Sequence, residues 1–360
     1  MSAAPTSLDD LQHAVAASLP GPLRIAGAGT KAAPPSAGEA STLDLRRLTG
    51  ITSYNPAECV LTALAGTPVA EIDAALAAHQ QYLPFDPTHG DAGGTIGGTV
   101  ASGLSGSGRY RYGGVRDFII GARVVDGHGR LIASGGQVVK NAAGFLTHHA
   151  LVGSAGRFGA IAEVTFKVFP RPEARATLRA DCASLHDAFA AHERLRAAAL
   201  DLEALDLALA PGSGATTLWA RLAGAADALP ARIVRAQALL PAGTLVLQDS
   251  DDARAWRDAA ACAWIAGATS LVKVPTAPTR VAAVTGVLAV LGTCRVQCGG
   301  AVVLLATSEP LDAVHVALAG HGWRGVAVCG PSHGRLLGVA RSDAFGSRVR
   351  LALDPDQRFH

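Results

Sequence analysis

Apolar residues recur with two different periods in the first half of the chain. Alternation of apolar and polar positions over Gly159–Phe169 predicts a half-buried strand. The turn sequence Asp126–Gly129 joins two further apolar runs, Phe118–Val125 and Leu131–Ser134, which predicts a hairpin. Helical spacing over Pro68–His79, with proline at its start, predicts a helix.

The pattern changes after Pro170-Arg171-Pro172, because glycine becomes rarer and helices alternate with strands. The alternating segments are Ser184–Ala199, Leu205–Ala210, Thr217–Leu222, Asp251–Ile265, Ser270–Val274, Pro278–Leu291, Arg295–Thr307 and Glu309–Ala319. We expect helices that cover one face of a largely antiparallel sheet. The sequence therefore predicts an α+β protein with a first domain over 1–172, an α+β cap over 173–330, and a segment over 331–360 that returns to the first domain.

Glycine gathers in the stretch Asp86–Ile120 and continues to Gly159. The residues from Gly90 to Gly159 hold 19 of the 41 glycines of the chain, and small residues fill the gaps between them. Such a sequence leaves backbone amides uncovered and lets a ligand approach them closely. It predicts a cradle for an extended anion, with a short helix over Thr95–Leu104 whose amide-rich start faces the ligand.

An early glycine turn has two interpretations. Gly27–Ala32 follows an apolar strand and matches the GxGxxA pattern of dinucleotide-binding folds. That pattern requires a helix, whereas Pro34 and Pro35 follow at once. A Rossmann unit, with Asp44 as its ribose-binding acid, therefore stands beside a phosphate-binding strand-turn-strand, which agrees better with the prolines.

Composition and charge exclude several classes of partner. The 360 residues suit two domains, and a net charge of +2 without a basic run argues against nucleic acid. The longest apolar runs fall short of the roughly 20 residues that span a bilayer. We expect no signal segment at the N-terminus, whose pattern instead predicts a helix capped by Ser7 with Asp10. Six scattered cysteines predict neither a disulfide framework nor an iron–sulfur cluster, so we expect a cytoplasmic protein.

Five sequence blocks in a fixed order resemble the FAD-binding domain of the vanillyl-alcohol-oxidase type, the PCMH type. They are GAGTK, DPTHGDAGGTIGGTVASG, RYGGVRDFIIGARVVDGHG, VKNAAGF and VGSAGRFGAIAEVTFKVFPRP, within Leu23–Pro172. Inside that superfamily they are most similar to the family of glycolate oxidase FAD-binding subunits, the E subunits. The terminal LALDPDQRF is similar to the family's closing segment but stops short of its asparagine-proline-glycine continuation. The resemblance implies a PCMH-type domain of two α+β subdomains, followed by an α+β cap.

The resemblance also implies FAD, held by three segments, and the lack of a histidine in the first of them predicts that the FAD is non-covalent. The implied contacts are Gly27, Ala28, Gly29, Thr30 and Lys31 in the pyrophosphate loop, then Asp86, Pro87, Thr95, Ile96, Gly97, Gly98, Thr99 and Ser102, and finally Gly159 and Ile161. The family commonly tethers flavin through a histidine of the first loop, where this chain has none. His89 of the second loop is expected to make a polar contact.

Oxidation of a 2-hydroxy acid needs a hydride acceptor, a base for the hydroxyl proton and a cation for the carboxylate. The candidates for base and cation are Arg109, Arg116, Lys140 and His148. Exposed arginines are usually solvated and paired histidines are usually structural, so the sequence assigns no catalytic residue. Relatives that act alone carry an HxGDGNxH metal motif, whereas the nearest stretch here, Cys329–Arg335, has one histidine and no acid. We therefore expect no metal.

The resemblance implies an FAD-binding subunit of a glycolate oxidase complex that oxidises a small D-2-hydroxy acid. Its implied partners are a paralogous flavoprotein and an iron–sulfur subunit, through which the complex could lie at the inner membrane. Two alternatives stay open. One is a standalone FAD-dependent 2-hydroxy-acid dehydrogenase, and the other is a non-catalytic assembly subunit with a vestigial flavin site, which would be colourless.

Overall fold

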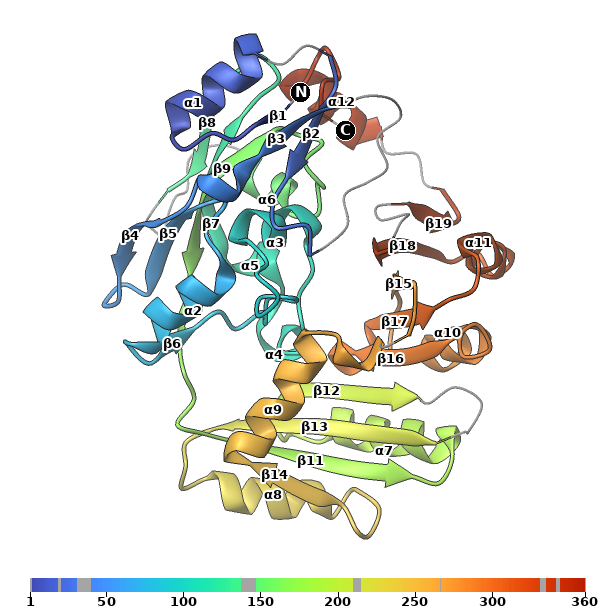
Figure 1. Cartoon of the computed structure of the whole chain (residues 1–360). Coiled ribbons are helices and arrows are strands. Elements are labelled where there is room, and N and C mark those ends of the chain that lie inside the picture. Colours follow the sequence, from blue (N-terminus) through green and yellow to red (C-terminus); the bar gives the residue numbers. More distant parts are fainter. Residues whose placement is uncertain are drawn as a thin grey trace. The chain divides into compact units, whose positions relative to one another are not determined.

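The computed structural model covers the whole chain and describes residues 2–18, 21–30, 40–136, 147–209, 215–265, 267–330, 335–340 and 344–359. The chain divides into two compact units, whose elements are labelled in Figure 1. Unit 1 comprises Met1–Ser105, Gly114–Arg171 and Arg341–His360, and unit 2 comprises Gly106–Gly113 and Pro172–Ala340. The short segment Gly106–Gly113 therefore belongs to unit 2, although its neighbours in sequence belong to unit 1.

Unit 1 contains an antiparallel five-stranded sheet of order β4-β5-β9-β7-β8 and a parallel three-stranded sheet of order β1-β3-β2. A separate antiparallel pair joins β6 to β10. The strands are β1 (Ser2–Ala3), β2 (Leu23–Ala26), β3 (Ser41–Asp44), β4 (Ile51–Asn55), β5 (Val60–Leu64), β6 (Gln81–Tyr82), β7 (Ile119–Val125), β8 (Leu131–Gly135), β9 (Ala160–Lys167) and β10 (Phe169–Pro170). The predicted hairpin is confirmed by the pairing of β7 with β8.

Helices and the chain end complete unit 1. The helices are α1 (Leu8–His13), α2 (Val69–Ala77), α3 (Ile96–Ser102), α5 (Val115–Phe118), α6 (Thr147–Leu151) and α12 (Ala344–Leu353). The predicted cap of α1 is confirmed, because the Ser7 side chain accepts from the Asp10 backbone N–H and the Asp10 carboxylate accepts from the Ser7 N–H. Phe359 lies fully buried in one core with Leu11 and Leu43, so the last residues pack into this unit.

Unit 2 is built on one antiparallel nine-stranded sheet of order β14-β11-β13-β12-β16-β17-β15-β18-β19. The strands are β11 (Ala174–Cys182), β12 (Leu202–Leu209), β13 (Thr216–Gly224), β14 (Leu245–Gln248), β15 (Ser270–Pro275), β16 (Thr293–Gln297), β17 (Val302–Thr307), β18 (Arg324–Cys329) and β19 (Leu336–Gly338). The helices are α4 (Arg109–Tyr112), α7 (Leu185–Ala197), α8 (Leu229–Gln237), α9 (Asp249–Ala260), α10 (Val281–Leu288) and α11 (Leu311–Gly320).

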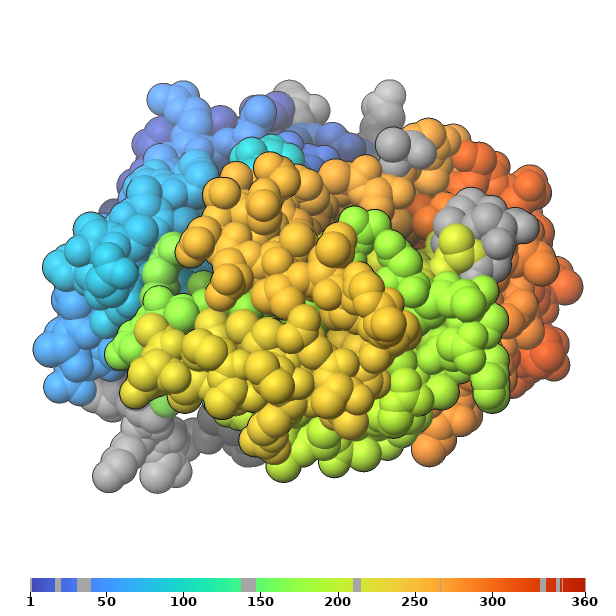
Figure 2. Space-filling view, turned by 90° about the horizontal axis from the view of Figure 1, so that it is seen from below, coloured from blue at the N-terminus to red at the C-terminus, as the bar shows by residue number. Residues whose placement is uncertain are grey.

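The helices of unit 2 do not all cover the same face of the sheet. Residues of α7, α8, α10 and α11 share one hydrophobic core with inward-facing strand residues such as Leu205 and Leu207, which confirms the predicted helical layer. Helix α9 differs, because its Trp256 and Ala259 pack with Ala204 in a separate cluster. Successive strand residues face opposite sides, so α9 covers the other face. Figure 2 shows α8 and α9 among the yellow and orange segments of the visible surface.

Within the described ranges, no helix is long and apolar enough to cross a membrane. All six cysteines have free thiols.

Candidate cofactor-binding site

The first two glycine segments meet in unit 1. A Cβ atom added at Gly27, in the loop after β2, would lie 2.9 Å from the Thr95 hydroxyl oxygen. A Cβ added at Gly94 would lie 3.4 Å from the Thr30 hydroxyl oxygen. The loop that follows β2 therefore lies directly against the residues that precede α3, as the predicted pyrophosphate loop and second cofactor segment require.

A third segment, the turn Gly153–Gly156, joins them. Its Gly153 N–H donates to the Val100 carbonyl at 2.9 Å, and its Ala155 N–H donates to the Ala101 carbonyl at 2.8 Å. On its other side, a Cβ at Gly156 would lie 3.3 Å from the Ile25 side chain. The turn therefore packs against both α3 and β2, and three separated sequence blocks converge.

The loop Gly27–Thr30 fits a diphosphate. Gly29 adopts a φ of 71°, and Ala28 and Gly29 are exposed. Among the described residues, the backbone N–H groups of this loop have no acceptor in the chain. The loop also follows the carboxyl end of a parallel strand, where anionic ligands commonly bind. Uncovered amides and small side chains can surround phosphate oxygens without a metal ion. Lys31 lies outside the described residues.

The alternative ribose role of Asp44 finds no support in its contacts. The Asp44 carboxylate accepts from the Arg46 backbone N–H at 3.0 Å and forms an ion pair with the Arg46 guanidinium at 2.6 Å. These contacts lower the pKa of Asp44. Asp44 therefore ends its own strand and caps the turn that follows it.

Two non-glycine residues of the second segment adopt left-handed backbone conformations. Asp86 has a φ of 46° and His89 a φ of 58°. The His89 carbonyl accepts from the Gly94 N–H at 3.1 Å, which closes the loop between them. Left-handed conformations of residues with a side chain are uncommon and gather at ligand sites. Pro87, between these two residues, is half-buried.

The expectation that the backbone N–H groups at the start of α3 face a ligand is wrong for three residues. The Ile96 N–H donates to Thr67, the Gly97 N–H donates to Ala65, at 2.9 and 2.8 Å, and the Gly98 N–H donates to the Thr95 hydroxyl. These three donors are therefore already engaged. Any contact of these residues with a ligand runs through other atoms.

The remaining expected contacts are packed into the chain itself. Thr99 is fully buried and its hydroxyl donates to the Thr95 carbonyl, while the Ser102 hydroxyl donates to the Thr99 carbonyl. A Cβ at Gly159, which has a φ of 127°, would lie 2.7 Å from the Val125 carbonyl oxygen, and Ile161 is only 4% exposed. Close packing of strands alone therefore requires glycine at position 159.

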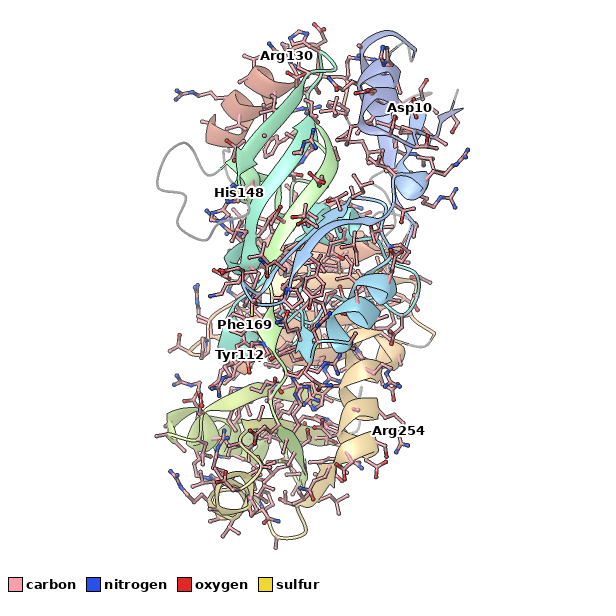
Figure 3. All side chains as sticks on the ribbon, turned by 90° about the vertical axis from the view of Figure 1, so that its left-hand side faces the viewer. Asp10, Tyr112, Arg130, His148, Phe169 and Arg254 are labelled. Atoms are coloured by element: carbon pink, nitrogen blue, oxygen red, sulfur yellow. The ribbon has the colours of Figure 1, made fainter. Side chains whose placement is uncertain are left out.

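The catalytic candidates lie in different environments. Arg109 is exposed in unit 2, and Arg116 is exposed in unit 1. His148, labelled in Figure 3, is 3% exposed, and its Nδ1 lies 3.0 Å from the Ser134 hydroxyl. Burial, followed by the neighbouring His149, lowers the pKa of His148. Lys140 falls outside the described residues.

Sequence reasoning missed an unusual carboxyl group beside the second segment. Burial raises the pKa of Asp73 on α2 to about 6, with the negative charges of Asp91 and Asp86 adding to the effect and Arg171 opposing it. A signal was present, because Asp73 stands at helical spacing from Val69 on an otherwise apolar face. Sites that bind ligands often contain such shifted groups.

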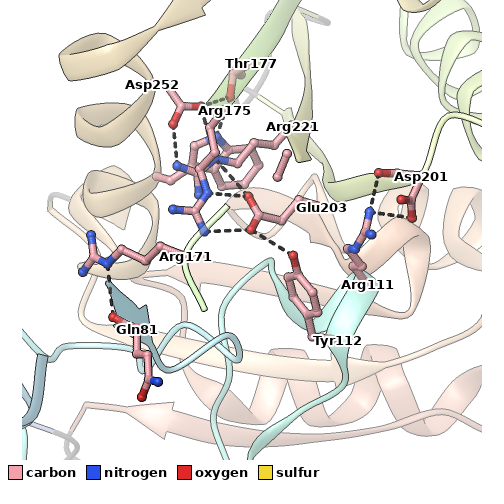
Figure 4. A network of polar contacts seen from close by, with 12 residues as sticks. Gln81, Arg111, Tyr112, Arg171, Arg175, Thr177, Asp201, Glu203, Arg221 and Asp252 are labelled. Atoms are coloured by element: carbon pink, nitrogen blue, oxygen red, sulfur yellow. Dashed lines mark hydrogen bonds and ion pairs between the residues drawn. The ribbon is translucent and has the colours of Figure 1, made fainter. Parts of the chain in front are cut away.

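A polar network in unit 2, shown in Figure 4, was also invisible in the sequence. Arg175 donates two hydrogen bonds of 2.9 Å to the Glu203 carboxylate, and Arg221 reaches Glu203 at 3.4 Å and also pairs with Asp252. The Tyr112 hydroxyl donates to Glu203 at 3.5 Å. The network thus ties Gly106–Gly113 to three strands, β11, β12 and β13, and to α9 within unit 2.

Potential metal ligands do not gather in the part of the chain that the structure describes, where no group of three His, Cys, Asp or Glu residues could hold an ion. Of the stretch Cys329–Arg335, residues 331–334 lie outside that part.

Comparison with known proteins relates the first two of the converging segments to FAD binding domains. Residues 1–135 match the family described as FAD binding domain. The chain is 44% identical to glycolate oxidase subunit GlcE of Escherichia coli strain K12 over 158 residues, which cover 44% of this chain and 45% of that protein. It is 32% identical to D-lactate dehydrogenase of Archaeoglobus fulgidus over 124 residues, which cover 34% of this chain and 28% of that protein. The chain thus spans less than half the length of these curated relatives.

A solved structure of alkyldihydroxyacetonephosphate synthase has a similar fold, with a TM-score of 0.73 at 14% identity over 99% of this chain and 75% of that one. At this identity the likeness concerns the fold alone, and it agrees with the α+β class predicted from the sequence. The matched family model includes the loop Gly27–Thr30 and the segment Asp86–Ser102. Through residues 1–135, the chain is therefore similar to the family described as FAD binding domain.

Proposed function

We propose that the chain is the FAD-binding subunit of a glycolate oxidase complex that oxidises a small D-2-hydroxy acid. The observation that carries the proposal is the convergence of three glycine segments in unit 1, in a chain that is similar over 158 residues to a glycolate oxidase subunit. The proposed partners are a paralogous flavoprotein and an iron–sulfur subunit, in the cytoplasm or at the inner membrane through those partners. When bound, FAD supplies the two-electron acceptor for oxidation of the acid.

The proposed cofactor contacts remain the three sets of residues predicted from the sequence. The amides of Gly27–Thr30 and the adjoining Lys31 would hold the diphosphate, because this loop has uncovered donors and exposed small residues. The residues from Asp86 to Ser102 and the pair Gly159 and Ile161 would lie along the rest of the molecule. We assign this role to the domain 1–172, and a covering role to the cap 173–330, with 331–360 as the closing segment.

The variant Ala28→Glu tests the cofactor site directly. Ala28 is exposed in the diphosphate loop, so a carboxylate there leaves the fold intact and repels the diphosphate. We expect FAD to bind at least about tenfold more weakly, which corresponds to about 1.4 kcal/mol. The matched control is Ala57→Glu in the exposed turn before β5. Equal FAD affinity of the two variants, measured by flavin fluorescence quenching, would contradict the assignment.

Acid precipitation tests the mode of attachment. The first loop offers no histidine, so we expect all flavin to remain in the supernatant after the protein is precipitated. Flavin that stays with the pellet would show a covalent bond. A colourless protein that does not take up added FAD would instead support the vestigial-site alternative.

A second candidate function is a standalone FAD-dependent 2-hydroxy-acid dehydrogenase. The similarity of the chain to D-lactate dehydrogenase of Archaeoglobus fulgidus favours this function. The purified flavin-loaded chain separates the two. If it alone reduces a soluble dye with glycolate or D-lactate at rates typical of enzymes, on the order of 1 per second or more, the standalone function is favoured. If turnover appears only after partner subunits are added, the subunit function is favoured.

A further inference from the structure

Lys273 lies in unit 2 on the sheet face opposite the hydrophobic core. Its neighbours in β15, Val272 and Val274, are fully buried in that core, and alternation along a strand therefore turns Lys273 to the other face. Its cross-strand partner Leu304 faces the same way and lies outside that core. The ammonium group is thus directed away from α10 and α11.

No acidic side chain among the described residues pairs with Lys273. Within the described ranges, its side chain makes no hydrogen bond or ion pair with the chain. Burial lowers the pKa of Lys273, and the positive charge of nearby Arg109 lowers it further, against a smaller opposite effect of Cys298. Arg295, on the same face beyond Leu304, differs because its guanidinium lies 3.2 Å from the buried Asp206 carboxylate. One cation of this face is therefore neutralised by the chain and the other is not.

The segment that carries Arg109 is fixed to this face. The Ser107 hydroxyl donates to the Asp206 carboxylate at 2.6 Å, and the Gln297 side-chain amide donates to the Ser107 hydroxyl at 3.2 Å. The Cys298 thiol donates to the Gly106 carbonyl at 3.8 Å. Buried hydrogen bonds of this kind hold a functional side chain more firmly than an unsupported loop can. The backbone that carries Arg109 is therefore held on the same sheet face as Lys273.

A strained turn meets the same segment. Cys298, Gly299 and Gly300 have φ values of 56°, 61° and 94°, and a Cβ at Gly299 would collide with the Tyr110 ring. Glycine adopts such conformations freely, whereas Cys298 keeps one only where the surrounding contacts impose it. The turn brings Gly106–Gly113 close to the sheet, and this independent observation also indicates a functional region.

We propose that Lys273 and Arg109 together bind the carboxylate of a small organic acid in unit 2. The planar guanidinium suits bidentate contact with a carboxylate, and the ammonium group adds a compact positive charge. A half-buried cation without an acidic partner is stabilised by a bound anion. The choice of a 2-hydroxy acid, with glycolate as the probe, rests on the proposed function. The presence of an anion site rests on unit 2 alone.

Titration calorimetry with the purified full chain tests the site. We expect glycolate to bind the wild type, and Lys273→Met to weaken binding at least about tenfold. The matched control is Lys167→Met at the end of β9, where the lysine lies over the Phe169 ring and faces no proposed ligand. Glycolamide, which lacks the charge, is expected to bind at least about tenfold more weakly than glycolate. Unchanged affinity in Lys273→Met, or no glycolate binding by the wild type, would overturn the inference.

Chemical labelling of the wild type gives a second test that no variant needs to survive. Lysines are acetylated with a succinimidyl ester, with and without glycolate, and each site is followed by peptide mass spectrometry. We expect glycolate to slow the labelling of Lys273 at least about threefold and to leave Lys167 unchanged. Protection of Lys273 in a chain that cannot hold FAD would refute the proposed function and support the site. No protection in a flavin-loaded chain would refute the site alone.

Discussion

His192 is expected to make unit 2 less stable in mild acid, and its replacement by leucine is expected to remove that sensitivity. The side chain lies on α7 with no exposed surface, beside the core residues Ala188, Ala191 and Leu195. Neither ring nitrogen has a hydrogen-bond partner among the described residues. Burial lowers the pKa of His192 from 6.5 to about 4, with a smaller lowering by Arg196 and an opposite effect of Glu193.

The sign and size follow from proton linkage. The unfolded chain takes up a proton at His192 as the pH falls below 6.5, whereas the folded chain does so only near pH 4. This contribution to stability is therefore lost as the pH falls from 6.5 to 4, and it amounts to about 3 kcal/mol at most because one pKa unit corresponds to about 1.4 kcal/mol. At pH 5 the expected loss is about 2 kcal/mol. At pH 7, leucine also removes an unpaired buried polar group, which favours the variant by about 1 kcal/mol or more.

Hydrogen exchange of α7 peptides is the appropriate assay, because two compact units need not unfold together. Wild type and His192→Leu are compared at pH 7 and pH 5 after correction for the intrinsic pH dependence of exchange. We expect the difference in opening free energy to grow by about 2 kcal/mol between these pH values. The control His186→Gln changes an exposed histidine on the same helix and is expected to show no such growth. A constant difference between wild type and His192→Leu would refute the reasoning.

Two further substitutions test contacts within single units. Phe359→Ala is expected to lower the unfolding free energy of unit 1 by about 3–5 kcal/mol, because the Phe359 side chain is fully buried. Leu351 on α12 is 58% exposed, so Leu351→Ala is expected to change this free energy little, and urea unfolding followed by hydrogen exchange in α1 measures both variants. Glu203→Gln leaves Arg175 and Arg221 without full charge compensation, so it is expected to lower the unfolding free energy of unit 2 by about 3 kcal/mol. Glu193→Gln, in the surface pair with Arg196, is expected to lower it by less than about 1 kcal/mol, and equal losses in the two variants would show that the network of Figure 4 is no stronger than a surface pair.

Periodic segments were predicted well from the sequence, because their apolar spacing decides the element directly. The helix expected over Ser184–Ala199 is α7 at Leu185–Ala197, with Ser184 as its cap. The element expected over Arg295–Thr307 is instead two strands, β16 and β17, separated by the left-handed turn at Cys298. A cysteine in a left-handed conformation is imposed by tertiary contacts, and no local preference announces it.

The membership of Gly106–Gly113 in unit 2 was equally hidden. The segment follows the glycine block of unit 1, and its arginines and tyrosines looked like a solvated loop. Its position depends on acids that lie far along the chain, since Arg111 pairs with Asp201 at 2.5 Å and Ser107 bonds to Asp206. Partners so distant in sequence cannot be paired without an alignment or a structure. For the same reason Lys273 looked like one strand residue among others.

The density of glycine predicts a cofactor region but does not separate two different demands on glycine. Gly97 and Gly159 are required by packing, because a Cβ at Gly97 would lie 2.6 Å from the Ala65 Cβ and one at Gly159 would meet the Val125 carbonyl. Gly29 has open space around it and a φ of 71°, so only its backbone conformation requires glycine. An alanine at Gly29 strains the loop by about 1–2 kcal/mol without a clash. The loop after β2 is therefore the part of the glycine-rich cradle whose backbone N–H groups can still bind a ligand. The first N–H groups of α3 instead hold the residues around Thr95 in place.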